Sequence, residues 1–208
     1  MKYKLAIFDF DGTLADSFGW FVQMVNSVAA RYNFKQVAEE EIEGLRSLSA
    51  LQLVRHLEIP LWKIPMIANH IRQLMSKDRA GISCFEGVDQ LLAQLHQAGM
   101  TLALVTSNSY ENVHHVLGAE NLALMSYIEC DVSMFGKRAR YRKILRKSGV
   151  PPSEVISIGD EIRDIEASNQ EHIPFGAVAW GYTHIDALKA HAPAEVFMQV
   201  GDILKLIS

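Results

Sequence analysis

The 208-residue sequence predicts an α/β fold, a doubly wound parallel sheet that carries a small all-helical cap domain. A continuous apolar run, Leu5 to Phe8, has the length of a strand buried on both faces. Between residues 16 and 81 apolar residues recur only at helical spacing, whereas after that point short apolar strands alternate with helices. We therefore expect residues 1–15 and 82–208 to form the core domain and residues 16–81 to form a helical cap domain.

The cap domain is expected to consist of four helices. Gly12 turns the chain after the first strand, and Asp16 or Ser17 can cap the helix that follows. Pro60 closes the third helical segment, and Pro65 can occupy the first turn of the fourth. By apolar spacing, the helices are expected over residues 18–32, 38–45, 49–57 and 65–75.

The core domain is expected to alternate helices and strands. Gly99 can end its first helix, and Pro151 lies in a turn before a strand. Strands are expected over residues 101–106, 127–132, 155–159, 175–180 and 195–198. Helices are expected over residues 87–97, 110–117, 138–148, 163–170 and 185–190, with a terminal helix after the last strand. This order is typical of a Rossmann-like sheet with helices on both faces.

Composition and charge are those of an ordinary globular protein. Hydrophobic residues make up 49% and charged residues 21% of the sequence, without low-complexity tracts or repeats, which argues against disorder and solenoid folds. A net charge of -4 and a pI of about 6.1 give no reason to expect a nucleic acid or an anionic membrane as partner. No apolar run approaches membrane-spanning length, and the N-terminal run is too short for a signal peptide. Cys84 and Cys130 lie far apart in the sequence, so we expect a reduced cytoplasmic protein. We expect either a monomer or a homodimer.

Two carboxylates, Asp9 and Asp11, stand where the first strand ends. Because ligands of open parallel sheets bind outside the carboxyl ends of the strands, both should face a pocket. One can act as an ionised nucleophile and metal ligand while the other exchanges a proton. Like charges so close need a cation, and Mg²⁺ is the hard ion that one or two carboxylates and a substrate phosphate usually hold. Read alone, the pair fits turn capping equally well.

Two later segments offer groups that could bind phosphate. The strand over residues 101–106 ends in Thr106, Ser107 and Asn108, and hydroxyls there could bind phosphate oxygens, although helix capping explains them better when they are read alone. Lys137 precedes a basic helix, where a cation could balance the charges of a nucleophile and a phosphoryl group. The alternative is a solvated basic face, since several Lys and Arg residues follow.

A second acidic cluster follows the strand over residues 155–159. This strand delivers Asp160 to its end, and Gly159 allows the backbone to approach closely. Asp164 lies one helical turn further on the same side. Two acids so placed can complete a hard-metal site with Asp9. Acids also stabilise helix N-termini, but capping does not explain the matching acids of the first strand.

The string Asp-Phe-Asp-Gly-Thr-Leu-Ala-Asp-Ser after the first strand resembles the first motif of the haloacid dehalogenase (HAD) superfamily of phosphatases and phosphotransferases. The three later segments match the remaining motifs in order, and the strings Gly-Lys-Arg and Gly-Asp-Glu-Ile-Arg-Asp-Ile-Glu-Ala are most similar to the phosphoglycolate-phosphatase-like group. The resemblance implies Asp9 as nucleophile, Asp11 as acid/base and Thr106 as the residue that holds the phosphoryl group. It implies Lys137 as the third-motif lysine, although many relatives have Lys-Pro there, which leaves Lys143 or an arginine open as a substitute.

The resemblance also implies an Mg²⁺ site. Asp9 and Asp160 would be direct ligands, and Asp11 would contribute its backbone carbonyl. Asp164 would be a ligand or a partner of the ligands. The same four residues are therefore the candidate metal site of this sequence.

The activity that the resemblance implies is Mg²⁺-dependent hydrolysis of a small organic phosphomonoester, phosphoglycolate-like or a sugar phosphate, through an aspartyl-phosphate. Thr106, Ser107, Asn108 and Arg46 are the candidate substrate-binding residues. In sugar-phosphate mutases of the family a cap arginine holds a second phosphate, whereas here Leu48 falls near that place and Arg46 is two residues away. A phosphomutase and a non-catalytic regulatory protein remain as alternatives.

Overall fold

The computed structural model describes residues 1–78, 81–134 and 136–208. Within these residues, six parallel strands form one sheet in the order β3-β2-β1-β4-β5-β6. The chain builds the sheet outward from β1 in one direction and then returns to place β4 on the other side of β1, so the strand order reverses between these two neighbours. The predicted doubly wound parallel sheet is confirmed. Its strands are β1 (Leu5–Phe8), β2 (Thr101–Val105), β3 (Met125–Glu129), β4 (Val155–Gly159), β5 (Phe175–Val178) and β6 (Glu195–Phe197).

Strand β1 lies at the centre of the sheet and of the core. Leu5 pairs with Thr101 of β2 and Val155 of β4, and every residue of β1 is fully buried. Its side chains point alternately to two apolar layers, which is why its sequence is an unbroken apolar run.

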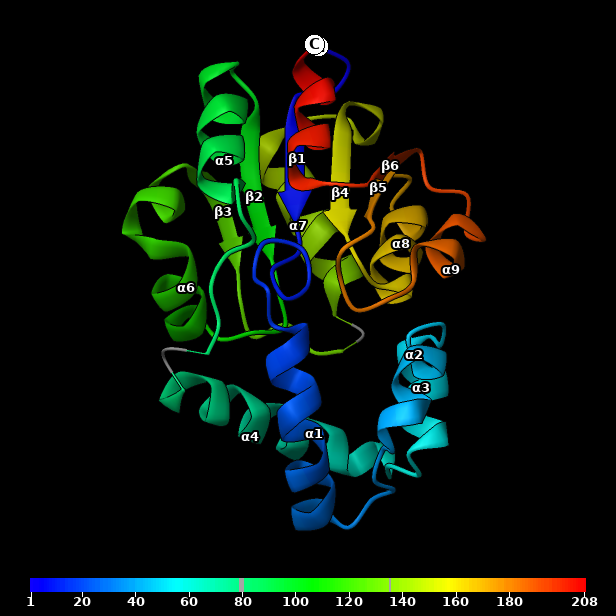
Figure 1. The fold of residues 1–208 in the computed structure, drawn as a ribbon. Coiled ribbons are helices and arrows are strands. Elements are labelled where there is room, and N and C mark those ends of the chain that lie inside the picture. Colours follow the sequence, from blue (N-terminus) through cyan, green and yellow to red (C-terminus); the bar gives the residue numbers. More distant parts are fainter. Residues whose placement is uncertain (79–80, 135) are drawn as a thin grey trace.

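Helices cover both faces of the sheet (Figure 1). On the face of Phe8, apolar side chains come from α5 (Val88–Gln97), α6 (Tyr110–Ala123) and the C-terminal 3₁₀-helix η4 (Val200–Ile207). On the face of Ile7 they come mainly from α7 (Lys137–Ser148), and α8 (Ile162–Gln170) and α9 (Ile185–Lys189) pack against β5. A short 3₁₀-helix, η3 (Pro152–Glu154), precedes β4.

The described residues between β1 and α5 form helices that lie beyond the carboxyl ends of the strands (Figure 1). These helices are α1 (Phe18–Tyr32), η1 (Glu39–Glu41), α2 (Ile42–Leu45), α3 (Ala50–His56), η2 (Leu61–Lys63) and α4 (Ile64–Lys77). The segment leaves and re-enters the core through two paired stretches of chain. Ala15 forms an antiparallel bridge with Cys84, and the Asp16 N–H donates to the Ser83 carbonyl at 2.9 Å.

Several predicted boundaries are wrong for physical reasons. Strand β3 runs over 125–129 rather than 127–132, because after Glu129 the chain turns across the end of β2 and the Val132 N–H donates to the Thr106 carbonyl. Helix α6 continues past 117 to Ala123 across a kink at Gly118, whose φ is 77°. Ser17 does precede α1, but its hydroxyl lies 3.1 Å from the Tyr182 hydroxyl and makes no capping bond. The terminal helix is of the 3₁₀ type.

Across the described parts of the chain, none of the helices combines the length and the apolar character that crossing a membrane requires.

Candidate active site

The strand order brings the sequence motifs to one edge of the sheet. Asp9 follows β1, Thr106 follows β2 and Asp160 follows β4, and these three strands are neighbours. The Asp9 N–H donates to the Ile158 carbonyl at 2.9 Å, which extends the pairing of β1 with β4 up to the first acid. The site therefore lies where the strand order reverses, outside the carboxyl ends of the strands.

Three buried carboxylates converge at this edge. One oxygen each from Asp9, Asp160 and Asp164 can be chosen so that all lie within 4.8 Å of one another. Among the described residues, Asp9 Oδ2 and Asp164 Oδ2 have neither a hydrogen-bond partner nor an ion-pair partner. Burial and the neighbouring acids raise the pKa of Asp160 well above its usual range, and burial raises the pKa of Asp164 to about 7. A hard divalent cation fits this donor set, because it would compensate the crowded charges and use the free oxygen of Asp164.

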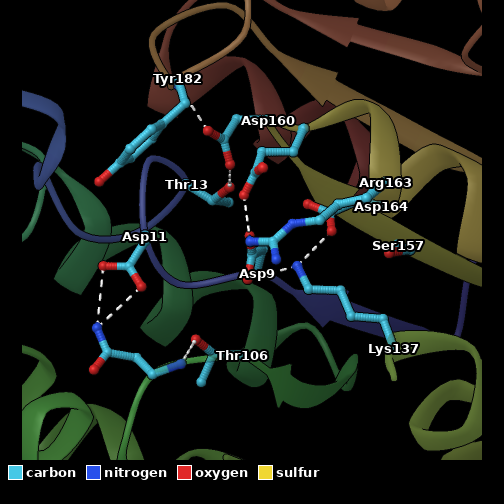
Figure 2. A network of polar contacts seen from close by, with 12 residues as sticks. Asp9, Asp11, Thr13, Thr106, Lys137, Ser157, Asp160, Arg163, Asp164 and Tyr182 are labelled. Atoms are coloured by element: carbon cyan, nitrogen blue, oxygen red, sulfur yellow. Dashed lines mark hydrogen bonds and ion pairs between the residues drawn. The ribbon is translucent and has the colours of Figure 1, made fainter. Parts of the chain in front are cut away.

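Asp160 is held by the loops on either side of it (Figure 2). Its Oδ1 accepts a bond from the Thr13 hydroxyl at 2.9 Å, and its Oδ2 accepts a bond from the Tyr182 N–H at 2.7 Å. Gly12 and Gly181 leave room for it, since a Cβ at Gly12 would lie 2.2 Å from Asp160 Oδ2 and one at Gly181 would lie 2.2 Å from Asp160 Cβ. The carboxylate is thus fixed before any ligand binds.

Lys137 places its ammonium group between two of the acids (Figure 2). Its Nζ lies 2.8 Å from Asp9 Oδ1 and also contacts Asp164 Oδ1. Burial by itself would lower the pKa of Lys137, but the carboxylates of Asp164 and Asp9 raise it, so the side chain stays charged. Lys143, the alternative cation, pairs instead with Glu129.

Asp11 is hydrogen-bonded to a side-chain amide. Asn108 Nδ2 lies 3.0 Å from Asp11 Oδ2 and 3.2 Å from Asp11 Oδ1. Burial and the charge of Asp9 raise the pKa of Asp11 to about 6. A carboxyl group with such a pKa can both give and take a proton near neutral pH.

The three residues after β2 have different surroundings. Thr106 is fully buried, and its Oγ1 accepts a bond from the Asn108 N–H at 2.9 Å, which leaves the hydroxyl proton available to donate. Asn108 contacts Asp11, as described above. Ser107 contributes its backbone carbonyl, which accepts a bond from Arg72 of α4 at 3.0 Å.

Arg46, a candidate substrate-binding residue, lies at the junction between α2 and the core. Its Nη2 donates to the Gly181 carbonyl at 2.9 Å and its Nε to the Tyr182 carbonyl at 3.1 Å. Its guanidinium carbon lies 4.7 Å from the centre of the Phe18 ring. The structure thus places this side chain on the rim of the core, next to the loop that holds Asp160.

Two residues of the site, Tyr182 and Arg163, are not among the candidates chosen from the sequence, where Tyr182 fits a rim loop and is interpreted as a packing residue. The Tyr182 ring packs against Phe18 at 5.2 Å between ring centres, and its backbone holds Asp160. Arg163 contacts Glu161 and extends to the side of Asp9 in Figure 2. Burial by itself would lower the pKa of Arg163, but the neighbouring carboxylates raise it. Two features of the sequence could have pointed to them: Tyr182 lies in an aromatic loop after β5, and Arg163 is a cation inside an acidic segment.

A family model described as haloacid dehalogenase-like hydrolase matches residues 6–178 of the chain. A phosphoglycolate phosphatase from Synechococcus elongatus is 29% identical over 203 residues, which cover 97% of this chain and 96% of that protein. An N-acetylmuramic acid 6-phosphate phosphatase from Pseudomonas aeruginosa is 25% identical over 208 residues, which cover 95% of this chain and 91% of that protein. A crystal structure from Lactobacillus plantarum has the same fold, with a TM-score of 0.83 and 23% identity over 99% of this chain and 100% of its own.

The matched region contains every acid of the site, from Asp9 to Asp164, and it extends from the first strand of the sheet to the fifth. The chain therefore belongs to the haloacid dehalogenase-like hydrolase family.

Proposed function

We infer that this hydrolase is a phosphatase, and we propose that it hydrolyses a small, phosphoglycolate-like or sugar phosphomonoester with the help of Mg²⁺ through an aspartyl-phosphate on Asp9. One observation carries the proposal. Asp9 has one carboxylate oxygen 2.8 Å from Lys137 Nζ, while its other oxygen is buried at the strand end without a described partner. Two similar proteins, a phosphoglycolate phosphatase and an N-acetylmuramic acid 6-phosphate phosphatase, support the substrate class.

Asp9, Asp160 and Asp164 would hold the Mg²⁺ ion, together with the backbone carbonyl of Asp11. The buried oxygens without partners and the raised carboxyl pKa values fit this group. When bound, Mg²⁺ supplies positive charge that offsets the charges of the carboxylates and of the phosphoryl oxygens.

In the first step the free oxygen of Asp9 attacks phosphorus, and the bond between phosphorus and the ester oxygen breaks. Lys137 and the Thr106 hydroxyl offset the charge on the phosphoryl oxygens. Asp11 donates its proton to the leaving ester oxygen, which departs as an alcohol. The raised pKa of Asp11, about 6, favours the protonated form that this step requires.

In the second step the Asp11 carboxylate takes a proton from a water molecule, and the water oxygen attacks phosphorus. The acyl-phosphate bond breaks, phosphate leaves and Asp9 is ionised again. Asp11 is then protonated and ready for the next ester, so the two steps balance.

We propose that residues 16–81 form a cap that closes over the site and selects the ester. Two contacts between this segment and the core support the proposal. Arg46 donates to the carbonyls of the loop at Gly181, and Arg72 donates to the Ser107 carbonyl. A substrate enclosed between these contacts would be kept from bulk water. Arg46 remains our candidate for a substrate contact on the cap side.

We also propose a cytoplasmic location. Both cysteines of the chain, Cys84 and Cys130, are free thiols, and burial raises the pKa of each to about 11. Unpaired thiols of this kind are typical of a reducing compartment.

The test is phosphate release from a panel of small phosphate esters with Mg²⁺, comparing the wild type with Asp9→Asn. We expect the substitution to abolish release, because an amide is not a nucleophile in this step. Asp16→Asn is the matched control, since it makes the same chemical change at an exposed acid of the neighbouring loop. Undiminished phosphate release by Asp9→Asn would refute the role of Asp9 as the nucleophile.

A further inference from the structure

A chain of side-chain amides connects helix α4 to the carboxylate of Asp11. Asn112 lies in α6 and is only 2% exposed. Its Nδ2 donates to Asn108 Oδ1 at 2.7 Å and to the Arg72 carbonyl of α4 at 3.0 Å. Asn108 in turn directs its own Nδ2 at both oxygens of Asp11. Both protons of the Asn112 amide group are therefore used, one toward the core and one toward α4.

These bonds decide which way the Asn108 amide points. Asn108 Oδ1 accepts from Asn112 Nδ2 and from the Ser109 N–H at 2.9 Å, so two donors fix the oxygen on that side. The NH₂ group must then face Asp11, next to the Met75 sulfur of α4 at 2.9 Å. A flipped amide would place its oxygen against a carboxylate and its nitrogen against two donors.

Both amides are buried, Asn108 at 5% and Asn112 at 2% exposure. Hydrogen bonds in such surroundings are stronger than in water, and an unpaired group there is costly. The orientation of Asn108 is therefore set by its partners rather than by solvent.

We propose that Asn112 is a positioning residue for Asp11: through Asn108 it fixes the orientation of the acid/base carboxylate, and its bond to the Arg72 carbonyl links that orientation to the docking of α4. This inference rests on the proposed function, in which Asp11 protonates the leaving ester oxygen. It predicts that loss of Asn112 slows the hydrolysis of esters whose leaving group needs this proton more than the hydrolysis of esters whose leaving group does not.

The kinetic test compares two substrates in the wild type and in Asn112→Leu, which removes both donors at similar volume. One substrate is the best alkyl phosphate of the panel, whose alcohol leaves only with a proton. The other is p-nitrophenyl phosphate, whose phenolate leaves without one. We expect Asn112→Leu to lower kcat/KM for the alkyl phosphate at least about tenfold more than for the aryl phosphate, because general acid catalysis contributes about 100-fold or more. We compare kcat/KM because it reports only the steps up to the aspartyl-phosphate, whereas the second step, in which Asp11 acts as a base, is the same for both esters.

Asn121→Leu is the matched control on the same helix. Asn121 Nδ2 donates to Asp89 Oδ1 at 2.6 Å and to the Leu117 carbonyl at 2.9 Å, and neither acceptor belongs to the chain of amides that holds Asp11. We expect this variant to keep the wild-type ratio of the two kcat/KM values. Equal losses of kcat/KM with both esters in Asn112→Leu, or no loss, would overturn the inference.

A second measurement does not depend on turnover. The side-chain amide protons of Asn108 can be followed by NMR hydrogen exchange in the wild type, Asn112→Leu and Asn121→Leu. We expect faster exchange in Asn112→Leu only, and unchanged exchange there would overturn the inference. If the wild type hydrolysed neither ester, the proposed function would fail and the exchange of Asn108 would still decide whether Asn112 positions it.

Discussion

Replacing Lys137 by Met should destabilise the metal-free protein strongly. The Lys137 side chain is 3% exposed and lies against Asp9 and Asp164, which are 3% and 0% exposed. Met keeps most of the volume but removes the charge, so two buried carboxylates lose the ammonium group that contacts both of them. Removal of one partner from a buried ion pair costs about 3–5 kcal/mol. In a chain of this length each kcal/mol corresponds to about 2–4 °C, so we expect the Tm to fall by roughly 6–20 °C.

The assay is thermal and urea unfolding in the presence of a chelator, followed by phosphate release with Mg²⁺. Lys143→Met is the matched control, because Lys143 lies in the same helix but pairs with Glu129 as a 37% exposed side chain. Exposed pairs contribute at most about 1 kcal/mol, so the control should unfold almost as the wild type does. We also expect Lys137→Met to lose at least about 100-fold in kcat, while Lys143→Met stays active.

A Lys137→Met protein within about 1 kcal/mol of the wild type would refute the reasoning, because the carboxylates would then need no cation. Loss of activity in Lys143→Met alone would instead assign the third-motif role to that residue.

Three further outcomes follow from the carboxylate cluster and its glycines. The metal-free protein should lose stability as the pH rises from about 4 to 8. The reason is that the raised pKa values of Asp11, about 6, and Asp164, about 7, make the folded state bind more protons than the unfolded chain. Urea unfolding across this range measures the free energy of unfolding, and an increase of that free energy with pH would contradict the prediction. Gly181→Ala should cost about 1–3 kcal/mol in thermal unfolding, because its Cβ would meet Asp160 at 2.2 Å. Gly19→Ala, with open space around its Cβ inside α1, should instead stabilise by about 0.5–1 kcal/mol, and equal effects of the two alanines would refute the steric argument. Asp160→Asn should weaken Mg²⁺ binding in calorimetry at least about tenfold, and unchanged affinity would remove this residue from the site.

The sheet and the convergence of the acids could be predicted from the sequence because strand ends carry strong local signals. An unbroken apolar run followed by an acid places Asp9 and Asp160 at the ends of neighbouring strands, and the structure brings both together. Thr106 and Lys137 follow the same logic, since Thr106 stands directly after β2 and Lys137 is the first residue of α7.

The contacts of the loops could not be predicted, because they join residues far apart in the chain. Tyr182 holds Asp160 through a backbone N–H, which any residue type except proline could supply. Arg46 has a long side chain with several possible partners, and only the fold places it beside the carbonyls of Gly181 and Tyr182. The role of Asn112 depends on a carbonyl of α4, 40 residues earlier in the sequence.

The paired stretches at Ala15 and Cys84 have a consequence for how such a protein can change. Since the chain departs from the sheet and returns to it side by side, the two ends of the intervening helical segment are held together at Ala15 and Cys84. The length and sequence of this segment can therefore vary without a shift in strand register. A lineage could exchange the segment for another while the acids at the strand ends of the sheet stay the same.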